Sequence, residues 1–201
     1  MQGVCKLSVR RRQQDRRTAT RRSLVAAARD LFAQKGYAAT STPEIVAAAG
    51  LTRGALYHHF ADKQALFAAV VEEEHALLAL TIHQAAEGGE DEPGPVKALI
   101  RGGEGFLSAM QDEGRRRILI VDAPAVLGRE AVDDIDSRHG LRTLVEGVGM
   151  AIEAGAIRDL PTLPLAHLLS ALFDRAALAP VGEVDAYRKV MKALIRGLRA
   201  K

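Results

Sequence analysis

The sequence predicts an all-α protein, with a small helical domain at its N-terminal end and a larger helical domain after it. Signals for strands are scarce, because only 4% of the residues are aromatic and β-branched residues rarely alternate with polar ones. Between the breaks the chain is dominated by Ala, Leu, Arg and Glu. Glycine and proline leave about nine helical segments. These are expected near residues 20–35, 42–49, 52–59, 63–86, 96–110, 115–121, 129–154, 163–179 and 184–199.

The first four helices have identifiable ends. Gly36 stops the first helix, at a position where a positive φ is required. Thr42 is expected to cap the second helix, and Gly50 follows the last residue of that helix. Thr52 can cap the third helix and Asp62 the fourth.

The last two segments each carry a broad apolar stripe, with apolar residues at offsets 0, 3, 4, 7, 8 and 11. Such stripes form either the core of a single chain or a four-helix interface between two copies. For a homodimer, the candidate interface residues are Leu165, Leu168, Leu172, Tyr187, Met191, Leu194 and Leu198.

Charge is distributed unevenly along the 201 residues, although the net charge is only +3. Residues 1–63 hold 12 Lys and Arg against 4 Asp and Glu, a net charge of +8, whereas the remainder holds 16 against 21, a net charge of −5. The first third should therefore attract polyanions. With one cysteine, no disulfide forms within the chain, and no apolar run long enough for a membrane span is present. A cytoplasmic location with no membrane partner is expected.

A short helix, a tight turn at Gly50 and a second short helix form the pattern of a helix-turn-helix, and they lie in the basic third. The second helix has to enter a major groove about 12 Å wide. Its small residues Gly54 and Ala55 permit close approach, while Arg53 and His58 offer hydrogen-bond donors to bases or phosphates.

About 45 residues around this pattern resemble the N-terminal domain of the TetR family of transcriptional regulators. The matching positions are Leu31-Phe32, Gly36-Tyr37, Thr40-Ser41-Thr42, Ile45, Ala48-Ala49-Gly50-Leu51-Thr52, Gly54, Leu56-Tyr57-His58-His59-Phe60, Asp62-Lys63 and Leu66. The resemblance implies nine or ten helices, a homodimer built on the last two, and a palindromic double-stranded DNA operator. It also implies release from the operator when a small molecule binds the larger domain.

Carried over residue by residue, the resemblance assigns backbone phosphate contacts to Tyr57 and Lys63. General chemistry supports both contacts apart from the resemblance, because a phenol can donate a hydrogen bond to phosphate and a lysine at a helix N-terminus forms an anion site. For Tyr57 the alternative is a half-buried ring that packs the third helix onto the first. The full set of candidate DNA-binding residues is Ser41, Thr42, Thr52, Arg53, Gly54, Ala55, Tyr57, His58 and Lys63.

We divide the chain into residues 1–17, a basic and disordered arm; 18–64, the DNA-binding domain; and 65–201, the effector-binding and dimerisation domain. Seven arginines lie within residues 10–22. The arm is either a solubilising tail or a segment that contacts DNA, and its position beside the helix-turn-helix favours contact.

The larger domain has apolar helices with few aromatic residues to fill volume, which favours a cavity for a small, largely apolar organic effector. Asp122 interrupts an apolar run before a proline, and either caps the next turn or faces this cavity. The candidate effector-binding residues are His75, Leu78, Ile82, Phe106, Asp122 and His139.

Other functional classes find less support. The pair Glu72 and His75 has the spacing of a carboxylate-bridged metal site, but no second copy accompanies it, so no metal and no cofactor are expected. No catalytic motif occurs, so the protein is not expected to be an enzyme. The remaining alternative is a DNA-binding architectural or activator protein without an effector.

Overall fold

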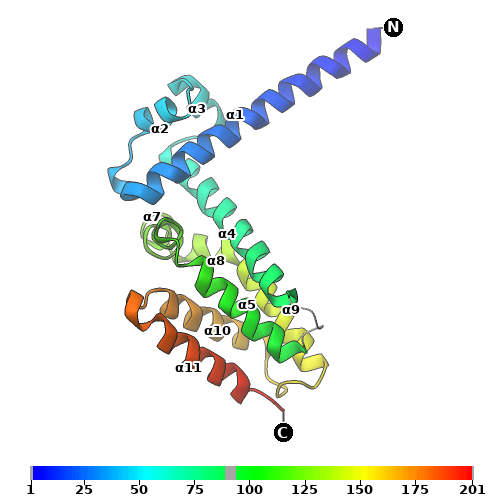
Figure 1. Cartoon of the computed structure of the whole chain (residues 1–201). Helices are drawn as coiled ribbons and strands as arrows, with labels where there is room; N and C mark the ends of the chain where they lie inside the picture. Colours follow the sequence, from blue (N-terminus) through cyan, green and yellow to red (C-terminus); the bar gives the residue numbers. More distant parts are fainter. Residues whose placement is uncertain (1, 89–93, 201) are drawn as a thin grey trace. The chain divides into compact units, whose positions relative to one another are not determined.

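The computed structural model describes residues 2–88 and 94–200, and they form helices (Figure 1). No strand occurs in these two ranges, where one antiparallel bridge joins Ile157 to Arg199. The chain folds as two compact units, residues 1–71 and 72–201. We call them the N-terminal and the C-terminal unit. The boundary falls inside helix α4 (Lys63–Glu87), a little later than the expected 64/65. No helix in the described ranges is long and apolar enough to cross a bilayer.

The N-terminal unit contains α1 (Gln2–Ala39), α2 (Thr42–Ala48), α3 (Arg53–His59) and the first two turns of α4. Helix α1 begins at Gln2, so it includes residues 2–17 of the segment that the sequence predicts to be a disordered arm. Neither glycine nor proline interrupts the chain between residues 4 and 35, and its Arg, Gln and Ala residues favour a helix. Gly36, with a φ of 83°, breaks the helix at the predicted place.

Apolar side chains from all four helices form the core of the N-terminal unit. The ring of Phe32 in α1 packs edge-on against that of Phe67 in α4, with their centroids 5.1 Å apart. The buried set is Leu24, Val25, Ala28, Phe32, Ile45, Val46, Leu56, Phe60, Leu66, Phe67, Val70 and Val71. This core holds the short helices α2 and α3, which are too short to be stable alone.

The C-terminal unit contains the rest of α4 and more helices than the sequence predicts. They are α5 (Pro95–Ala109), α6 (Glu113–Arg116), the π-helix η1 (Arg117–Asp122), α7 (Ala123–Leu127), α8 (Arg129–Ser137), α9 (Gly140–Glu153), α10 (Thr162–Ala177), the short 3₁₀-helix η2 (Val181–Glu183) and α11 (Val184–Gly197). The single segment expected at 129–154 is two helices, because the backbone leaves the helical conformation at His139, with φ −128° and ψ −99°.

The segment expected at 115–121 is also divided. It begins as α6, widens into the π-helix η1 and continues as α7. Pro124 explains the widened turn, because it has no N–H to donate and its ring crowds the carbonyl group four residues earlier.

The core of the C-terminal unit joins α5, α9, α10 and α11. Val148, Leu169 and Ile195 are among its buried side chains. Gly103 in α5 lets the ring of Phe173 in α10 approach closely, because a Cβ atom at Gly103 would lie 2.5 Å from that ring. The buried carboxylate of Glu74 in α4 accepts a hydrogen bond of 2.7 Å from Arg115 in α6.

Candidate functional site

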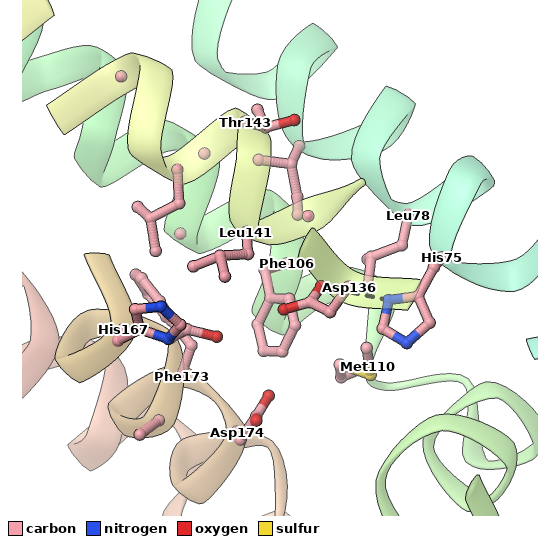
Figure 2. A pocket seen from close by; sticks show the side chains of 18 of the residues that line it. His75, Leu78, Phe106, Met110, Asp136, Leu141, Thr143, His167, Phe173 and Asp174 are labelled. Atoms are coloured by element: carbon pink, nitrogen blue, oxygen red, sulfur yellow. Dashed lines mark ion pairs between the residues drawn. The ribbon is translucent and has the colours of Figure 1, made fainter. Parts of the chain in front are cut away.

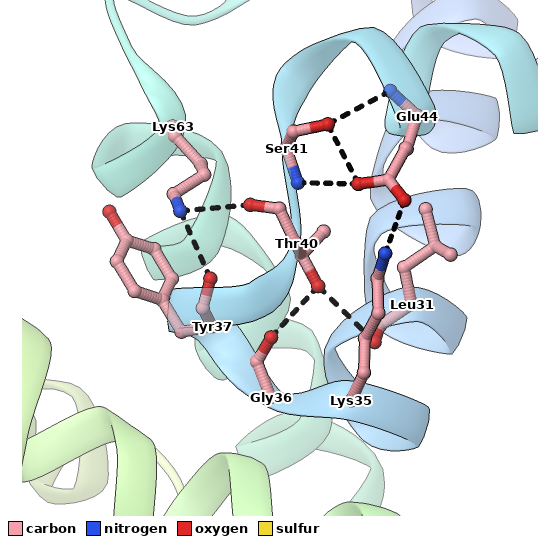
Figure 3. Close-up of polar contacts among 8 residues, drawn as sticks. All are labelled: Leu31, Lys35, Gly36, Tyr37, Thr40, Ser41, Glu44 and Lys63. Carbon is pink, nitrogen blue, oxygen red and sulfur yellow. Dashed lines mark hydrogen bonds and ion pairs between the residues drawn. The ribbon is translucent and has the colours of Figure 1, made fainter.

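The beginning of α2 is closed by a reciprocal capping box one residue earlier than expected. Ser41, not Thr42, is the N-cap: its Oγ accepts from the N–H of Glu44 (3.5 Å), and Oε2 of Glu44 accepts from the N–H of Ser41 (2.9 Å) (Figure 3). The Ser41 hydroxyl also donates to Glu44 Oε2 (2.7 Å), while Lys35 in α1 bonds to Oε1 of Glu44. These donors, Lys35 first, lower the pKa of Glu44 to about 2. The Ser41 side chain is therefore engaged in the cap.

The turn between α2 and α3 has the predicted geometry. Gly50 follows the C-cap Ala49 with a φ of 64°, and Thr52 caps α3 by accepting from the N–H of Ala55 (3.2 Å). On α3 only Leu56 is buried, whereas Arg53 and His58 are exposed. The two helices are thus fixed by local caps and by the core beneath them, and α3 presents its polar side to solvent.

Tyr57 lies on this exposed side of α3, with 47% of its surface accessible. Hydrogen bonding with the Thr42 side chain is the main reason that the pKa of Tyr57 is lowered, followed by hydrogen bonding with Arg53. The guanidinium carbon of Arg53 lies 6.0 Å from the centre of the Tyr57 ring. Thr42, Arg53 and Tyr57 consequently form one polar group across the start of α2 and α3.

Lys63 is more constrained than the sequence suggested. Its Nζ donates to the carbonyl oxygens of Tyr37 (3.0 Å) and Thr40 (2.9 Å), and lies 4.0 Å from the centre of the Tyr37 ring (Figure 3). The Thr40 hydroxyl in turn donates to the carbonyl of Gly36 (2.8 Å). Lys63 therefore satisfies carbonyl groups at the end of α1. An ammonium group has three N–H bonds, and these two carbonyl groups account for two of them.

Exposed arginines on α1 add positive charge to the N-terminal unit. Arg16, Arg17, Arg21 and Arg22 are exposed, and the guanidinium carbon of Arg21 lies 5.1 Å from the centre of the Phe60 ring. Burial lowers the pKa of His59, and the positive charges of His58, Arg17 and Arg21 act in the same direction. The surface beside α3 is therefore cationic, which suits a polyanion.

A cavity of about 890 Å³ lies in the C-terminal unit, lined by residues from α4, α5, η1, α7, α8, α9 and α10. Four of the six residues expected there, His75, Leu78, Ile82 and Phe106, line the cavity. Asp122 and His139 do not.

The geometry explains why Asp122 and His139 lie outside the cavity. Asp122 ends the π-helix η1, whose widened turn shifts the direction of its side chains. His139 lies at the break between α8 and α9, and its Nε2 contacts Glu72 in α4. Glu72 also accepts from Arg138, and these hydrogen bonds, that of Arg138 first, lower the pKa of Glu72.

Sequence reasoning missed the main polar groups of the cavity wall. Asp136 in α8 and Asp174 in α10 line the cavity beside Phe106 and Phe173 (Figure 2). Asp136 belongs to an acidic run that resembles an ordinary solvated helix face, and Asp174 lies between the last residues of the apolar stripe of α10 without a motif of its own. Among the described residues, no three His, Cys, Asp or Glu side chains are placed to hold a metal ion.

The apolar stripes of α10 and α11 divide between core and surface. Met191, expected at the interface, is buried in the core, whereas Leu165, Tyr187 and Leu198 are partly buried and pack against that core. Three other candidates remain exposed: Leu168 (66%), Leu194 (45%) and Leu172 (41%). A stripe with offsets 0, 3, 4, 7, 8 and 11 is wide enough for one edge to face the core and the other to face solvent.

Comparison with known proteins identifies both units. The family described as bacterial regulatory proteins, tetR family, matches residues 24–70, and the family described as tetracyclin repressor-like, C-terminal domain, matches residues 96–200. The Tn10 TetC protein of Escherichia coli is 28% identical over 83% of this chain and 82% of its own length. The A-factor receptor protein of Streptomyces griseus is 33% identical over 52% of this chain, but the match covers 35% of that protein.

The crystal structure of a TetR-family transcriptional regulator from Pectobacterium atrosepticum has the same fold. It is 30% identical to this chain, with a TM-score of 0.77, and the match covers 93% of this chain and 97% of the other. The helix-turn-helix of the N-terminal unit, the helical C-terminal unit and these matches agree, and the chain is therefore a member of the TetR family of transcriptional regulators.

Proposed function

We propose that this protein is a repressor that binds a palindromic DNA operator as a dimer and leaves it when a small, largely apolar molecule occupies the cavity. One observation carries the proposal: a single chain combines an exposed polar face on α3 with an apolar-lined cavity of about 890 Å³ in its other unit. That volume is within the range of sites for small organic ligands, roughly 300–1,000 Å³.

In this proposal the DNA contacts divide into two kinds. Thr42, Tyr57 and Lys63 bind backbone phosphates and fix the register of the protein, while Thr52 and Arg53 at the start of α3 approach the bases. Gly54 and Ala55 keep α3 slim where it enters the groove, and His58 extends its polar face. Ser41 contributes through its cap on α2.

Selection from random DNA duplexes tests the first half of the proposal. A dimer should recover an inverted repeat whose half-sites lie about one helical turn, roughly 34 Å, apart or a little more. Binding should weaken steeply with salt. Recovery of single-stranded or sequence-blind binding alone would contradict it.

Release by an effector is tested with a library of small molecules. Compounds that raise the melting temperature are added to the complex with labelled operator, and they should displace the DNA. Displacement requires that the compound bind the released conformation more tightly than the DNA-bound one. If every stabilising compound left the operator affinity unchanged, the cavity would not control DNA binding.

A further inference from the structure

Two partly buried carboxylates lie in the wall of the cavity. Asp136 comes from α8 and Asp174 from α10, and both approach the same space beside the Phe106 ring (Figure 2). Desolvation, and after it the negative charge of Asp136, raise the pKa of Asp174 to about 6. No described residue forms a hydrogen bond or an ion pair with the Asp174 carboxylate. The wall therefore contains two acids whose negative charges repel each other.

His75 from α4 adds an unsatisfied group beside these acids. It is 7% exposed and lines the cavity, and neither of its ring nitrogens has a hydrogen-bond partner among the described residues. Nδ1 lies 3.3 Å from Oδ1 of Asp136, which is an ion-pair distance, but without hydrogen-bond geometry. Buried polar groups without partners are rare in folded proteins and mark places where a ligand or water completes the bonding.

The cationic residues of the wall neutralise these acids only in part: the charge of Arg129 lowers the pKa of Asp174, but desolvation and the charge of Asp136 outweigh it. Arg129 and Arg175 line the cavity, but both are exposed, and the guanidinium carbon of Arg175 lies 5.6 Å from the centre of the Tyr187 ring. Solvent screens charges at such positions more than charges inside the cavity. An anionic ligand would therefore be repelled by Asp136 and Asp174 more than it is attracted by the exposed arginines.

We infer that the effector is an organic cation, an apolar molecule with a protonated amine that Asp174 and Asp136 bind and that His75 helps to position. This inference rests on the proposed function, since it names the chemical class of the effector. An ammonium group relieves the repulsion between the two acids and provides donors for their oxygens. The Phe106 and Phe173 rings, with centroids 5.7 Å apart, supply apolar contact and negative ring faces for the cation.

Two matched sets of probes test the charge preference by isothermal titration calorimetry on the protein without DNA. They are 4,4-diphenylbutylamine, 4,4-diphenylbutan-1-ol and 4,4-diphenylbutanoate, and decylamine, decan-1-ol and decanoate. Within at least one set the amine should bind about tenfold or more tightly than the alcohol, because a charge-assisted hydrogen bond is stronger than a neutral one, and the carboxylate should bind most weakly. Asp174→Asn and Asp136→Asn should each reduce the affinity for the amine by about tenfold and change that for the alcohol by less than about threefold.

Asp134→Asn is the matched control, because Asp134 lies on α8 with Asp136 but pairs with Arg138 outside the cavity. It should leave the affinity for the amine unchanged. The inference is overturned if neither amine binds, if the alcohol or the carboxylate binds as tightly as the amine, or if the two Asn variants retain the affinity of the wild type. Amine binding that does not displace operator DNA would contradict the proposed function and leave the ligand class in place.

Discussion

Lys63 connects the end of α1 to the start of α4, since its ammonium group bonds to the carbonyl oxygens of Tyr37 and Thr40. Lys63→Ala should lower the free energy of unfolding by about 1–2 kcal/mol through the loss of these bonds. It should also weaken DNA binding to a similar degree for every sequence and reduce the slope of log K against log salt by about one, because one phosphate contact is lost. Urea denaturation and binding titrations at several salt concentrations measure the two effects.

Arg53→Ala provides the contrast, because the exposed Arg53 at the beginning of α3 is proposed to approach the bases. Its main effect should be a change of base preference, by about 1–3 kcal/mol at the affected position. If Lys63→Ala altered the preference and left the salt slope unchanged, the assignment of Lys63 to phosphate would be wrong.

Asp174 should destabilise the protein at neutral pH. Its pKa is raised to about 6, from 3.8, so the folded protein holds the proton more tightly than the unfolded chain does. Stability therefore falls as pH rises from about 4 to 6 and remains low above that, with Asp136 and Asp133 adding to this cost and His75 and Arg129 reducing it. Asp174→Asn should raise the free energy of unfolding by about 1–3 kcal/mol at pH 7.5 and change it little at pH 4.

Thermal and urea unfolding at the two pH values measure this effect, and Asp185→Asn is the control, because its side chain is fully exposed. Equal stability of Asp174→Asn and wild type at pH 7.5 would contradict the burial of an unneutralised carboxylate. Asp174 is also proposed to bind the effector. Residues that bind a ligand often lower the stability of the protein without the ligand.

At the scale of elements, α5 and α10 can approach closely only because Gly103 has no side chain. A Cβ atom there would lie 2.5 Å from Cε1 and 2.6 Å from Cζ of Phe173, so Gly103→Ala forces the ring to move. We expect a loss of about 1–3 kcal/mol in the free energy of unfolding, as for other overpacked cores. Because Phe173 lines the cavity, the affinity for ligands should change as well.

Gly197→Ala is the matched control, since nothing lies within 4 Å of a Cβ atom at this position in α11. Alanine favours a helix by up to about 1 kcal/mol over glycine, so this variant should be as stable as wild type or more stable. Differential scanning calorimetry of both variants tests this prediction. Equal melting temperatures would show that the α5–α10 contact adapts to the new methyl group without a loss of stability.

At the scale of the whole molecule, the exposed apolar residues of α10 and α11 are the basis for the proposed dimer. Leu168→Glu and Leu194→Glu should produce folded monomers, because these side chains are exposed within one chain and only an interface would bury the new carboxylate. Met191→Glu lies on α11 with Leu194 but in the core, so it should prevent folding. Sedimentation velocity and circular dichroism distinguish the two outcomes.

The monomers should also bind the inverted repeat far more weakly, because each then contacts a single half-site. Wild type that sediments as a monomer at micromolar concentration would refute the dimer. Variants at Leu168 and Leu194 that remain dimeric would place the interface elsewhere on the molecule.

The sequence by itself determined the helical class, the helix-turn-helix and most helix ends. Gly36 and Gly50 adopt the predicted positive φ. Thr52 and Asp62 each cap a helix, because the side chain accepts a hydrogen bond from the N–H group three residues later. Such features depend on residues within one helical turn, so a local pattern contains what is needed. Even the cap of α2 was misplaced by one residue only, from Ser41 to Thr42.

The tertiary structure alone decided which side chains meet in the cavity. Asp136 and Asp174 are far apart in the sequence and come together because the break at His139 and the packing of α8, α9 and α10 set the rotation of each helix. Likewise, Met191 and Leu194 belong to one stripe, but Met191 is buried in the core and Leu194 is exposed. The positions of the neighbouring helices determine this difference. Helical periodicity specifies a face, whereas the angle at which that face meets its neighbours depends on contacts distant in sequence.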